Sequence, residues 1–426
     1  MNIADLHYKF LSTRGVSTDT RTLKKGELFF ALSGENFNGN KFAHDALNKG
    51  ADFIVIDDES FDMSSDTRII LVKDALVALQ QLANYHRKYL GLPIIALTGS
   101  NGKTTTKNLI ERVLSQQYQV YATIGNLNNH IGVPLTLLSL TAEHDFGIIE
   151  MGANHIGEIE LLCKIAEPNY GYITNFGKAH LEGFGSIEGV IKAKSELYNY
   201  LAEHRGEVFV YDNDKKQKEL TEKQGRITFG SGASYDFELI SSQPKLHFKY
   251  KNNTIRTDLV GDYNFVNCIA ALTIGEYFGV PAVKAIRAIS TYHPENNRSE
   301  IRVTKINTLL LDAYNANPTS VKAAIENFME VEHPNKKMIL GDMFELGSYA
   351  KFEHQAVVDL LKEETVLEVY LIGENYYATD SSSLQISKFK NYEDFIQKIK
   401  SEPIEGAYVL IKGSRGMALE RLVEFL

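Results

Sequence analysis

The sequence has little of what builds disulfide-rich or membrane proteins: no tryptophan, nine prolines and two cysteines in 426 residues. Cys163 and Cys268 have no second Cys or His at metal-ligand spacing, which argues against a disulfide framework and a zinc site. No stretch approaches 18 uncharged apolar residues, and the first ten residues lack the apolar core of a signal peptide. These absences predict a cytoplasmic protein that does not insert into a membrane.

Basic residues are outnumbered, with 45 Lys and Arg against 54 Asp and Glu, so the net charge is −9. Such a field opposes non-specific binding to nucleic acid and to anionic membranes. The hydrophobic share of 44% and the charged share of 23% are ordinary for folded proteins, which excludes a disordered or coiled-coil chain. At about 150 residues per domain, the length indicates roughly three domains.

Strand-like and helical runs alternate along most of the chain, which predicts an α/β fold with mostly parallel sheets. Strand-like runs at 208–211, 226–229 and 246–250 predict an antiparallel insertion or edge. A polar, proline-containing linker at 293–297 precedes a second doubly wound pattern. The predicted domains are a small α/β unit at 1–90, a central unit at 91–295 and a C-terminal Rossmann-like unit at 296–426.

A phosphate-loop pattern follows the apolar strand 94–97 and precedes a helix. Its glycines let backbone N–H groups turn toward phosphate oxygens, Lys103 reaches the terminal phosphates, and Thr104 can bind magnesium. Leu97 stands where the common pattern has glycine, and an ordinary Gly-rich turn is the alternative. The predicted ATP-binding residues here are Gly99, Ser100, Asn101, Gly102, Lys103, Thr104 and Thr105.

Three further residues suggest a reaction centre. Glu150 ends an apolar strand, where it can hold magnesium or simply begin a helix. His180 can bind a metal or phosphate, although a lone His is more often a structural hydrogen-bonding group. Lys194 lies on the apolar stripe of the helix 187–201, while Lys192 points elsewhere. A cation on a core-facing stripe must be neutralised, paired or modified, unless its ammonium reaches solvent past a packed stem.

Amide-rich loops offer candidate substrate contacts, with rigid turn chemistry as the alternative. Asn126, Asn128 and Asn129 share one such loop. Another follows the strand 309–312 and contains Asn315 and Asn317, and Asn264 and Asn267 begin a further helix.

In this order, the motifs resemble those of the Mur ligase family of ATP-dependent amide-forming enzymes, from about residue 17 to the C-terminus. The motifs that carry the resemblance are Gly125-Asn126-Leu127-Asn128-Asn129, Glu150-Met151-Gly152-Ala153-Asn154-His155, His180-Leu181-Glu182-Gly183-Phe184-Gly185-Ser186, Asp312-Ala313-Tyr314-Asn315-Ala316-Asn317-Pro318, Gly341-Asp342-Met343-Phe344-Glu345-Leu346-Gly347 and Lys412-Gly413-Ser414-Arg415-Gly416. The resemblance implies an N-terminal UDP-sugar domain, a central ATPase and a C-terminal domain that closes on the nucleotide.

The resemblance also implies a role for each matching residue. Lys103, His180 and Lys194 are the implied catalytic residues, and Thr104, Glu150, His180 and a carbamylated Lys194 are the implied magnesium ligands. Asn264, Asn267, Arg298 and Asp312 are implied to bind ATP. The implied substrate-binding residues are Ser17, Asp19, Arg21, Glu35, Phe37, Asn126, Asn128, Asn129, Asn315 and Asn317.

The implied reaction joins D-alanyl-D-alanine to UDP-N-acetylmuramoyl-tripeptide through an acyl phosphate, with ATP and Mg²⁺, in peptidoglycan precursor synthesis. We expect a monomer. Two rivals remain: another amide ligase of the same superfamily, and a nucleotide-hydrolysing switch or motor. A switch would need neither a core-facing lysine nor a UDP-sugar domain.

Overall fold

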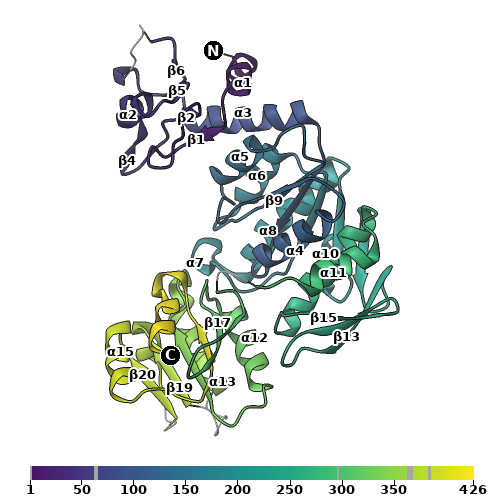
Figure 1. Cartoon of the computed structure of the whole chain (residues 1–426), viewed down its shortest axis with the longest axis vertical. Coiled ribbons are helices and arrows are strands. Elements are labelled where there is room, and N and C mark those ends of the chain that lie inside the picture. Colours follow the sequence, from purple (N-terminus) through teal and green to yellow (C-terminus); the bar gives the residue numbers. More distant parts are fainter. Residues whose placement is uncertain (1, 62–65, 295–296, 362–367, 382–384) are drawn as a thin grey trace.

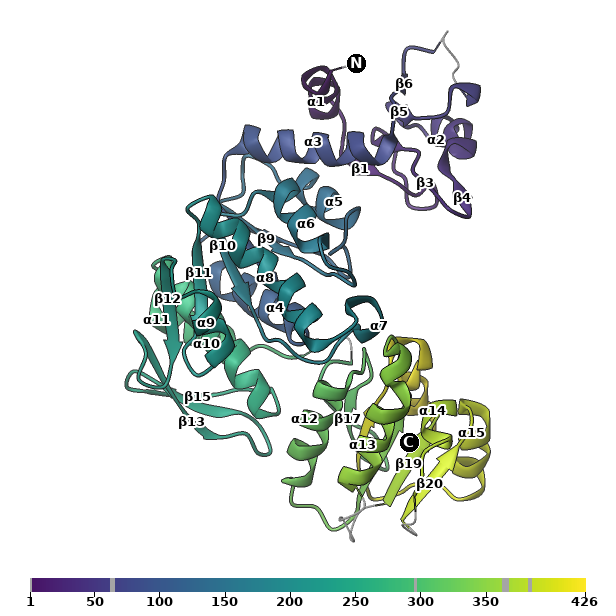
Figure 2. The same cartoon turned by 180° about the vertical axis from the view of Figure 1, so that it is seen from behind.

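A computed structural model describes residues 2–61, 66–294, 297–361, 368–381 and 385–426. The molecule is C-shaped, with the N-terminal and C-terminal parts at the two tips and the central part between them (Figures 1 and 2). Each part is built on its own α/β sheet. The predicted α/β fold with three units is therefore confirmed.

The N-terminal part contains a four-stranded parallel sheet in the order β1-β2-β5-β6. Its strands are β1 (Val16–Ser17), β2 (Leu28–Phe30), β5 (Phe53–Ile56) and β6 (Ile69–Leu71), and β3 (Ser33–Gly34) and β4 (Phe37–Asn38) form a separate hairpin. Its helices are α1 (Ile3–Leu11), α2 (Ala43–Asn48) and α3 (Ala75–Leu90). The Asp74 carboxylate accepts the Val77 N–H at the start of α3, and Gly91, with φ +67°, ends it. This long helix leads into the central part (Figure 2).

The central part is a nine-stranded sheet in the order β15-β14-β13-β12-β11-β10-β7-β9-β8. Its strands are β7 (Ile94–Thr98), β8 (Val120–Ala122), β9 (Phe146–Glu150), β10 (Tyr170–Ile173), β11 (Glu207–Tyr211), β12 (Arg226–Gly230), β13 (Tyr235–Ser241), β14 (His247–Tyr250) and β15 (Asn253–Arg256). Its helices are α4 (Lys103–Leu114), α5 (Gly132–Leu138), α6 (Glu158–Ala166), α7 (Leu181–Phe184), α8 (Ile187–Glu203), α9 (Lys215–Leu220), α10 (Asp262–Tyr277) and α11 (Ala282–Ser290).

Strand β7 shows why this sheet reads as continuous apolar runs. Ile94 and Ala96 pack into one hydrophobic cluster, which includes side chains of α6 and α8. Ile95 and Leu97 face the opposite cluster, with side chains of α4 and α10. Because both faces are covered by helices, every residue of the strand is buried and no polar alternation remains.

The prediction of an antiparallel insertion was wrong for two of its three strand-like runs. Strands β11 and β12 continue the parallel sheet, and β13 also runs parallel to β12. Antiparallel pairing begins only where β14 pairs with β13 and β15 with β14. Helix α9 connects β11 to β12 as a crossover.

The C-terminal part has a six-stranded sheet in the order β16-β17-β21-β18-β19-β20, parallel except for β16. Its strands are β16 (Glu300–Val303), β17 (Thr308–Asp312), β18 (Lys336–Gly341), β19 (Glu368–Ile372), β20 (Ile386–Phe389) and β21 (Tyr408–Lys412). Its helices are α12 (Pro318–Met329), α13 (Ala350–Leu361), α14 (Glu374–Tyr377) and α15 (Tyr392–Ser401). Short 3₁₀ turns occur at η1 (Gly39–Phe42), η2 (Glu59–Phe61), η3 (Gly347–Tyr349), η4 (Arg415–Met417) and η5 (Leu419–Phe425).

The exact domain limits stay predictions, and the one at 295/296, within the predicted linker, lies outside the described residues. Among the residues that the structure does describe, no helix combines the length and apolar character needed to cross a membrane.

Candidate active site between the central and C-terminal parts

A cavity of about 770 Å³ lies where the central and C-terminal sheets direct the carboxyl ends of their strands toward each other. Loops after β7, β9 and β10 form one side, and loops after β17 and β21 form the other. Ligands of open α/β sheets bind at such strand ends. The predicted site residues that line it are Ser100, Asn101, Gly102, Lys103, Thr104, Thr105, Asn126, Asn128, Asn129, Glu150, His180, Asn264, Asn267, Arg298, Asp312, Asn315 and Asn317.

The predicted phosphate loop has the conformation that its glycines require. Gly99 has φ +144° and Gly102 has φ +79°, and a Cβ on Gly99 would lie 1.9 Å from the Thr174 hydroxyl. Asn175 and Thr174, after β10, hold the loop by hydrogen bonds to the backbone of Asn101. No side chain caps the start of α4, so its first N–H groups remain available to phosphate oxygens.

Lys103 lies at the centre of this loop. Its ammonium donates hydrogen bonds to the carbonyl oxygens of Gly99 (2.7 Å) and Ser100 (3.3 Å), so it folds back over the loop. Burial lowers the pKa of Lys103, the nearby Glu150 carboxylate raises it, and the charge of Arg298 lowers it. The side chain is thus a desolvated donor at the position where terminal phosphates are expected.

Glu150 ends β9 with a carboxylate of which only one oxygen is used. Oε1 accepts a hydrogen bond of 2.8 Å from the Asn128 side chain, whereas Oε2 is buried and has no hydrogen-bond partner. A buried, unsatisfied carboxylate oxygen in a polar cavity fits a hard cation such as Mg²⁺, and Thr104 lines the same cavity. In the described part of the chain, no three His, Cys, Asp or Glu side chains converge as a metal site on their own.

His180 meets a side chain from the C-terminal part. Its Nδ1 lies 2.5 Å from the Glu345 carboxylate, and the side-chain hydrogen bond from His180 lowers the pKa of Glu345. The Glu345 carbonyl also accepts the Glu182 N–H. His180 therefore bridges the two parts here, so its predicted role as a metal ligand stays a prediction.

Lys194 does not line the cavity but lies directly behind its wall. Only 1% of the residue is exposed, and its ammonium donates to the carbonyl of Ala153, which does line the cavity, at 3.4 Å. The Phe184 ring lies 5.1 Å from that ammonium. Burial, and next the charge of Lys103, hold the pKa of Lys194 well below its usual range. The apolar stripe on α8 thus places a lysine in the core, as predicted, and Lys192 is exposed.

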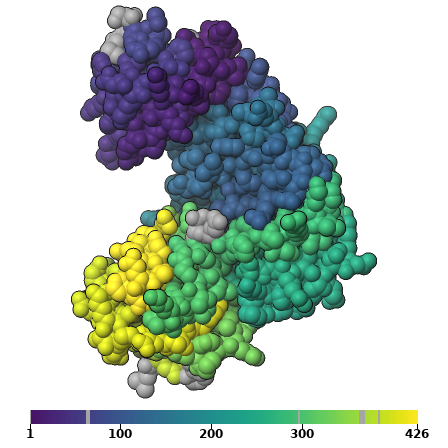
Figure 3. Space-filling view, in the orientation of Figure 1, coloured from purple at the N-terminus to yellow at the C-terminus, as the bar shows by residue number. Residues whose placement is uncertain are grey.

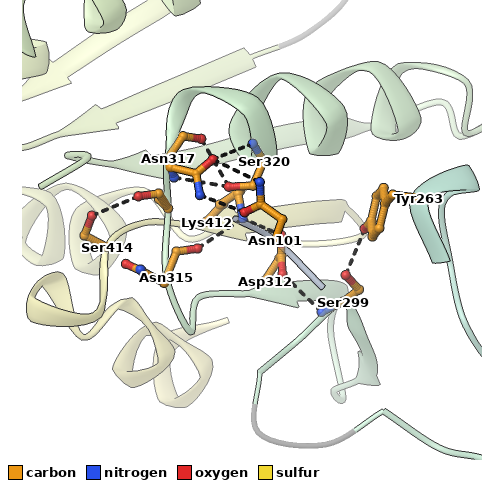
Figure 4. A network of polar contacts seen from close by, with 10 residues as sticks. Asn101, Tyr263, Ser299, Asp312, Asn315, Asn317, Ser320, Lys412 and Ser414 are labelled. Atoms are coloured by element: carbon orange, nitrogen blue, oxygen red, sulfur yellow. Dashed lines mark hydrogen bonds and ion pairs between the residues drawn. The ribbon is translucent and has the colours of Figure 1, made fainter. Parts of the chain in front are cut away.

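The C-terminal wall is centred on Asp312 and Lys412 (Figure 4). These residues are register partners on β17 and β21, and the Lys412 ammonium lies 2.5 Å from Asp312 Oδ2. Lys412 also donates to the Asn315 carbonyl, and Asp312 Oδ1 accepts the Ser299 N–H. The two residues form a largely buried ion pair beneath this wall, because only 2% of the Lys412 side chain is exposed.

Asn317 joins the two walls. Its Oδ1 accepts the Ser320 N–H at the start of α12, and its Nδ2 donates to Asn101 Oδ1 at 2.7 Å (Figure 4). The Asn317 amide is therefore an N-cap and a contact to the phosphate loop. Asn315, by contrast, is exposed in the cavity.

The remaining predicted asparagines differ in how freely they face the cavity. In α10, Asn267 donates to Asn264 and accepts from Thr106, and Asn264 donates to the Val260 carbonyl. Asn129 accepts the N–H groups of Ile131 and Gly132, which is turn chemistry, whereas Asn126 is exposed. Rigid turn chemistry therefore accounts for Asn129, and substrate contact stays a prediction for the others.

The predicted N-terminal residues lie outside this cavity. Ser17 and Asp19 hydrogen-bond to each other, and Arg21 forms a pair with Asp19 (Nη2 to Oδ2, 2.6 Å) that lowers the Asp19 pKa to about 2. Glu35 lies in the turn between β3 and β4, and Phe37 stacks on Phe42 with 55% of its surface exposed. The hairpin lies on the side of the N-terminal part that faces the open space between the two tips of the C-shaped molecule. Figure 3 shows this space as a hollow in the surface.

Sequence reasoning assigned no role to several residues that the fold brings to the cavity. Glu345, Lys412 and Arg415 belong to motifs that were quoted for the resemblance, and each follows or ends a strand of the C-terminal sheet. Their position at strand ends was a usable signal. Tyr314 had the same signal, because it belongs to the quoted motif that follows β17. Glu158 and Tyr263 carried no comparable signal, because nothing local in the sequence sets them apart.

Family models match nearly the whole chain. "Mur ligase family, catalytic domain" matches residues 12–87, "Mur ligase middle domain" residues 97–275 and "Mur ligase, glutamate ligase domain" residues 297–415. UDP-N-acetylmuramoyl-tripeptide–D-alanyl-D-alanine ligase from Bacillus subtilis is 36% identical over 437 aligned positions, covering all of this chain and 95% of the relative.

Two solved structures have the same fold throughout. A MurF crystal structure from Acinetobacter baumannii has a TM-score of 0.87 at 29% identity, with 97% of this chain and 93% of that chain covered. MurF from Thermotoga maritima in complex with ADP has a TM-score of 0.85 at 26% identity, with 97% of both chains covered.

Proposed function

The chain belongs to the Mur ligase family, and we propose that it joins D-alanyl-D-alanine to UDP-N-acetylmuramoyl-tripeptide, with ATP converted to ADP and phosphate. The product is UDP-N-acetylmuramoyl-pentapeptide, a peptidoglycan precursor. The reaction is an acid–amino-acid ligation that uses ATP and Mg²⁺. Relatives of that name match over the full chain, which favours this reaction over other amide ligations of the superfamily and over a nucleotide switch.

One observation carries the proposal: the phosphate loop and the free Glu150 oxygen face the C-terminal loops across a single cavity. A carboxylate is a poor electrophile, so it must be activated before an amine can displace oxygen from it. Attack of the tripeptide carboxylate on the γ-phosphate gives an acyl phosphate and ADP. The amine of D-alanyl-D-alanine then forms the amide bond and releases phosphate.

The chain's own groups position and neutralise these charges. Lys103 and the N–H groups at the start of α4 bind the phosphates. Glu150, Thr104 and His180 would hold Mg²⁺, and the bound ion would supply positive charge next to the phosphates. Asn128 orients Glu150 through its 2.8 Å hydrogen bond. Asn264, Asn267, Arg298 and Asp312 contact the nucleotide, and Asn315 with Asn317 lies on the dipeptide side.

Lys194 has the chemistry that carbamylation needs. A neutral amine attacks carbon dioxide, and burial favours the neutral amine by lowering the pKa of Lys194. The amine loses a proton as the bond to carbon forms, and the resulting carbamate would be an anion next to the Ala153 carbonyl that could serve as a further Mg²⁺ ligand.

The N-terminal surface around Asp19, Arg21 and the β3–β4 hairpin binds the UDP-muramoyl peptide. Its place facing the gap of the C allows a long substrate to extend from there toward the ATP cavity (Figure 3). We further propose that the protein acts as a monomer in the cytoplasm. Both of its cysteines are free and buried, which suits a reducing compartment.

The test is phosphate release from ATP with each combination of the two acceptors. We expect release and pentapeptide formation only when UDP-N-acetylmuramoyl-tripeptide and D-alanyl-D-alanine are both present. Release that ignores either compound, or equal turnover with single amino acids in place of the dipeptide, would contradict the proposal.

A further inference from the structure

The dipeptide substrate carries a negative charge that the residues assigned so far do not bind. D-Alanyl-D-alanine is a zwitterion: its amine reacts, and its carboxylate must lie on the far side of the dipeptide, away from the phosphates. A carboxylate that leaves water for a protein cavity needs a cation or several donors. That this carboxylate needs a binding cation rests on the proposed function.

Lys103 and Lys412 are already engaged. Lys103 folds over the phosphate loop and binds two of its carbonyl oxygens. Lys412 is neutralised by Asp312 at 2.5 Å, with almost no exposed side-chain surface. A second carboxylate at Lys412 would approach Asp312 as a like charge, which opposes binding there.

Arg298 lies toward the phosphate end of the cavity. Its charge lowers the pKa of Lys103 and also that of Lys107, one turn further along α4. A cation this close to the loop lysines adds to the field that attracts ATP phosphates. The dipeptide carboxylate, which must avoid those phosphates, is directed elsewhere.

Arg415 remains on the C-terminal wall of the cavity. Its backbone is anchored, because the preceding Ser414 donates its N–H to the Asp342 carbonyl and its hydroxyl accepts the Phe344 N–H at 2.8 Å. The side chain itself is 64% exposed, and its nearest acid, Glu420, is 3.9 Å away. A side chain whose backbone is held rigidly and whose guanidinium is exposed suits the recognition of a ligand carboxylate.

The neighbours of Arg415 place it on the dipeptide side. Strands β17 and β21 pair in parallel, so the loop with Asn315 and the loop with Arg415 emerge side by side. The guanidinium carbon of Arg415 lies 5.3 Å from the centre of the Tyr314 ring, and that of Arg298 lies 3.4 Å from the same ring. Both arginines therefore pack against Tyr314, the residue directly before Asn315.

We propose that Arg415 binds the C-terminal carboxylate of D-alanyl-D-alanine and so selects an acceptor that ends in a free carboxylate. A guanidinium and a carboxylate match as a two-point pair, which fixes the dipeptide's direction as well as its charge. With its tail held there, the dipeptide presents its amine toward the acyl phosphate.

The test compares D-alanyl-D-alanine with D-alanyl-D-alaninamide, which has the same shape and amine but no carboxylate. For the unaltered enzyme we expect kcat/KM to be about 50-fold higher with the acid than with the amide. Arg415→Gln is expected to remove most of this preference by lowering kcat/KM for the acid alone. Arg415→Lys is expected to retain an intermediate preference, since lysine keeps the positive charge but cannot form the two-point pair with a carboxylate.

Arg302→Gln is the matched control. Arg302 lies on β16 of the same sheet, is also partly exposed and also pairs with a glutamate, Glu300, but does not line the cavity. It is expected to change neither the preference nor the KM for ATP. Equal losses for acid and amide in Arg415→Gln, or a rise confined to the KM for ATP, would overturn the assignment.

The same measurements separate this inference from the proposed function. If the unaltered enzyme does not use D-alanyl-D-alanine at all, the proposed function is wrong and the assignment is wrong with it. If the enzyme uses the dipeptide and Arg415→Gln keeps the full preference for the acid, the assignment alone is wrong.

Discussion

The ATP cavity and the N-terminal substrate surface are built in opposite ways. In and directly behind the wall of the cavity, Glu150, Lys194 and Lys412 are charged or ionisable groups of which no more than 2% is exposed, held by the fold itself. On the N-terminal surface, 87% of the Arg21 side chain is exposed, and its partner Asp19 is its neighbour in the chain. Interactions are strong in a dry site and weak in water. The cavity is therefore organised for chemistry before substrate arrives, whereas the N-terminal surface gains strength only when a ligand covers it.

The largest effect should come from the buried lysine. Lys194→Ala is expected to lower kcat by about 10³-fold, because it removes an ionisable group from a dry reaction centre. Short carboxylic acids such as acetate should restore part of the activity, because they can occupy the space of the proposed carbamate. Lys192→Ala, an exposed lysine on the same helix, is the control and should leave kcat unchanged. Full activity of Lys194→Ala would make this residue purely structural.

The second largest effect on activity is expected from a change in the backbone of the phosphate loop. Gly99→Ala introduces a Cβ 1.9 Å from the Thr174 hydroxyl at a φ of +144°, so the loop must shift. A displacement of this kind should lower kcat/KM for ATP by about 10²-fold. The comparison is Gly34→Ala on the N-terminal hairpin, where a Cβ meets nothing within 4 Å. Similar ATP kinetics in both variants would show that the cavity is not preorganised.

A smaller effect is expected on the exposed surface. Arg21→Ala should raise the KM for the UDP-muramoyl peptide about 10-fold and leave kcat nearly unchanged. The reason is that the lost contact binds the substrate equally well in the ground state and in the transition state. Arg68→Ala is a close control, because Arg68 forms the same kind of pair with Asp66, whose pKa it also lowers to about 2. A large fall in kcat for Arg21→Ala would erase the contrast between the two regions.

The smallest effect concerns two buried histidines that join α1 to α3. A carbonyl can only accept, so His86 donates from Nε2 to the Leu140 carbonyl, and in a neutral His86 ring Nδ1 then accepts the hydrogen bond of 3.0 Å from His7 Nε2. Burial lowers both pKa values below 6.5. Below pH 6.5 the unfolded chain therefore binds more protons than the folded one. The free energy of unfolding then decreases as the pH is lowered, by at most about 1.4 kcal/mol per pH unit for each proton.

Denaturant unfolding between pH 7.5 and 5.5 measures this loss. His86→Gln should flatten the decline, whereas His44→Gln, at an exposed position of the same part, should leave it unchanged. An unaltered decline in His86→Gln would mean that other groups cause it.

The sequence predicted the cavity better than it predicted the sheet around it. Gly99, Lys103 and Glu150 were recognisable because their chemistry is tied to local order: strand, loop and helix start. The direction of β11 and β12 was not, because a short apolar run has the same pattern in a parallel and an antiparallel pair. Asn317 shows a third case, since its amide reaches Asn101, which is 216 positions away in the chain.

By itself, the sequence determined the α/β pattern, the phosphate loop, the core-facing position of Lys194 and the family motifs, because each depends on spacing within one element or loop. Only the tertiary structure decided which groups meet: His180 with Glu345, Lys412 with Asp312, and Arg415 with the Tyr314 ring. Such meetings depend on how separate sheets direct their strand ends toward each other, and no local pattern of residues encodes that.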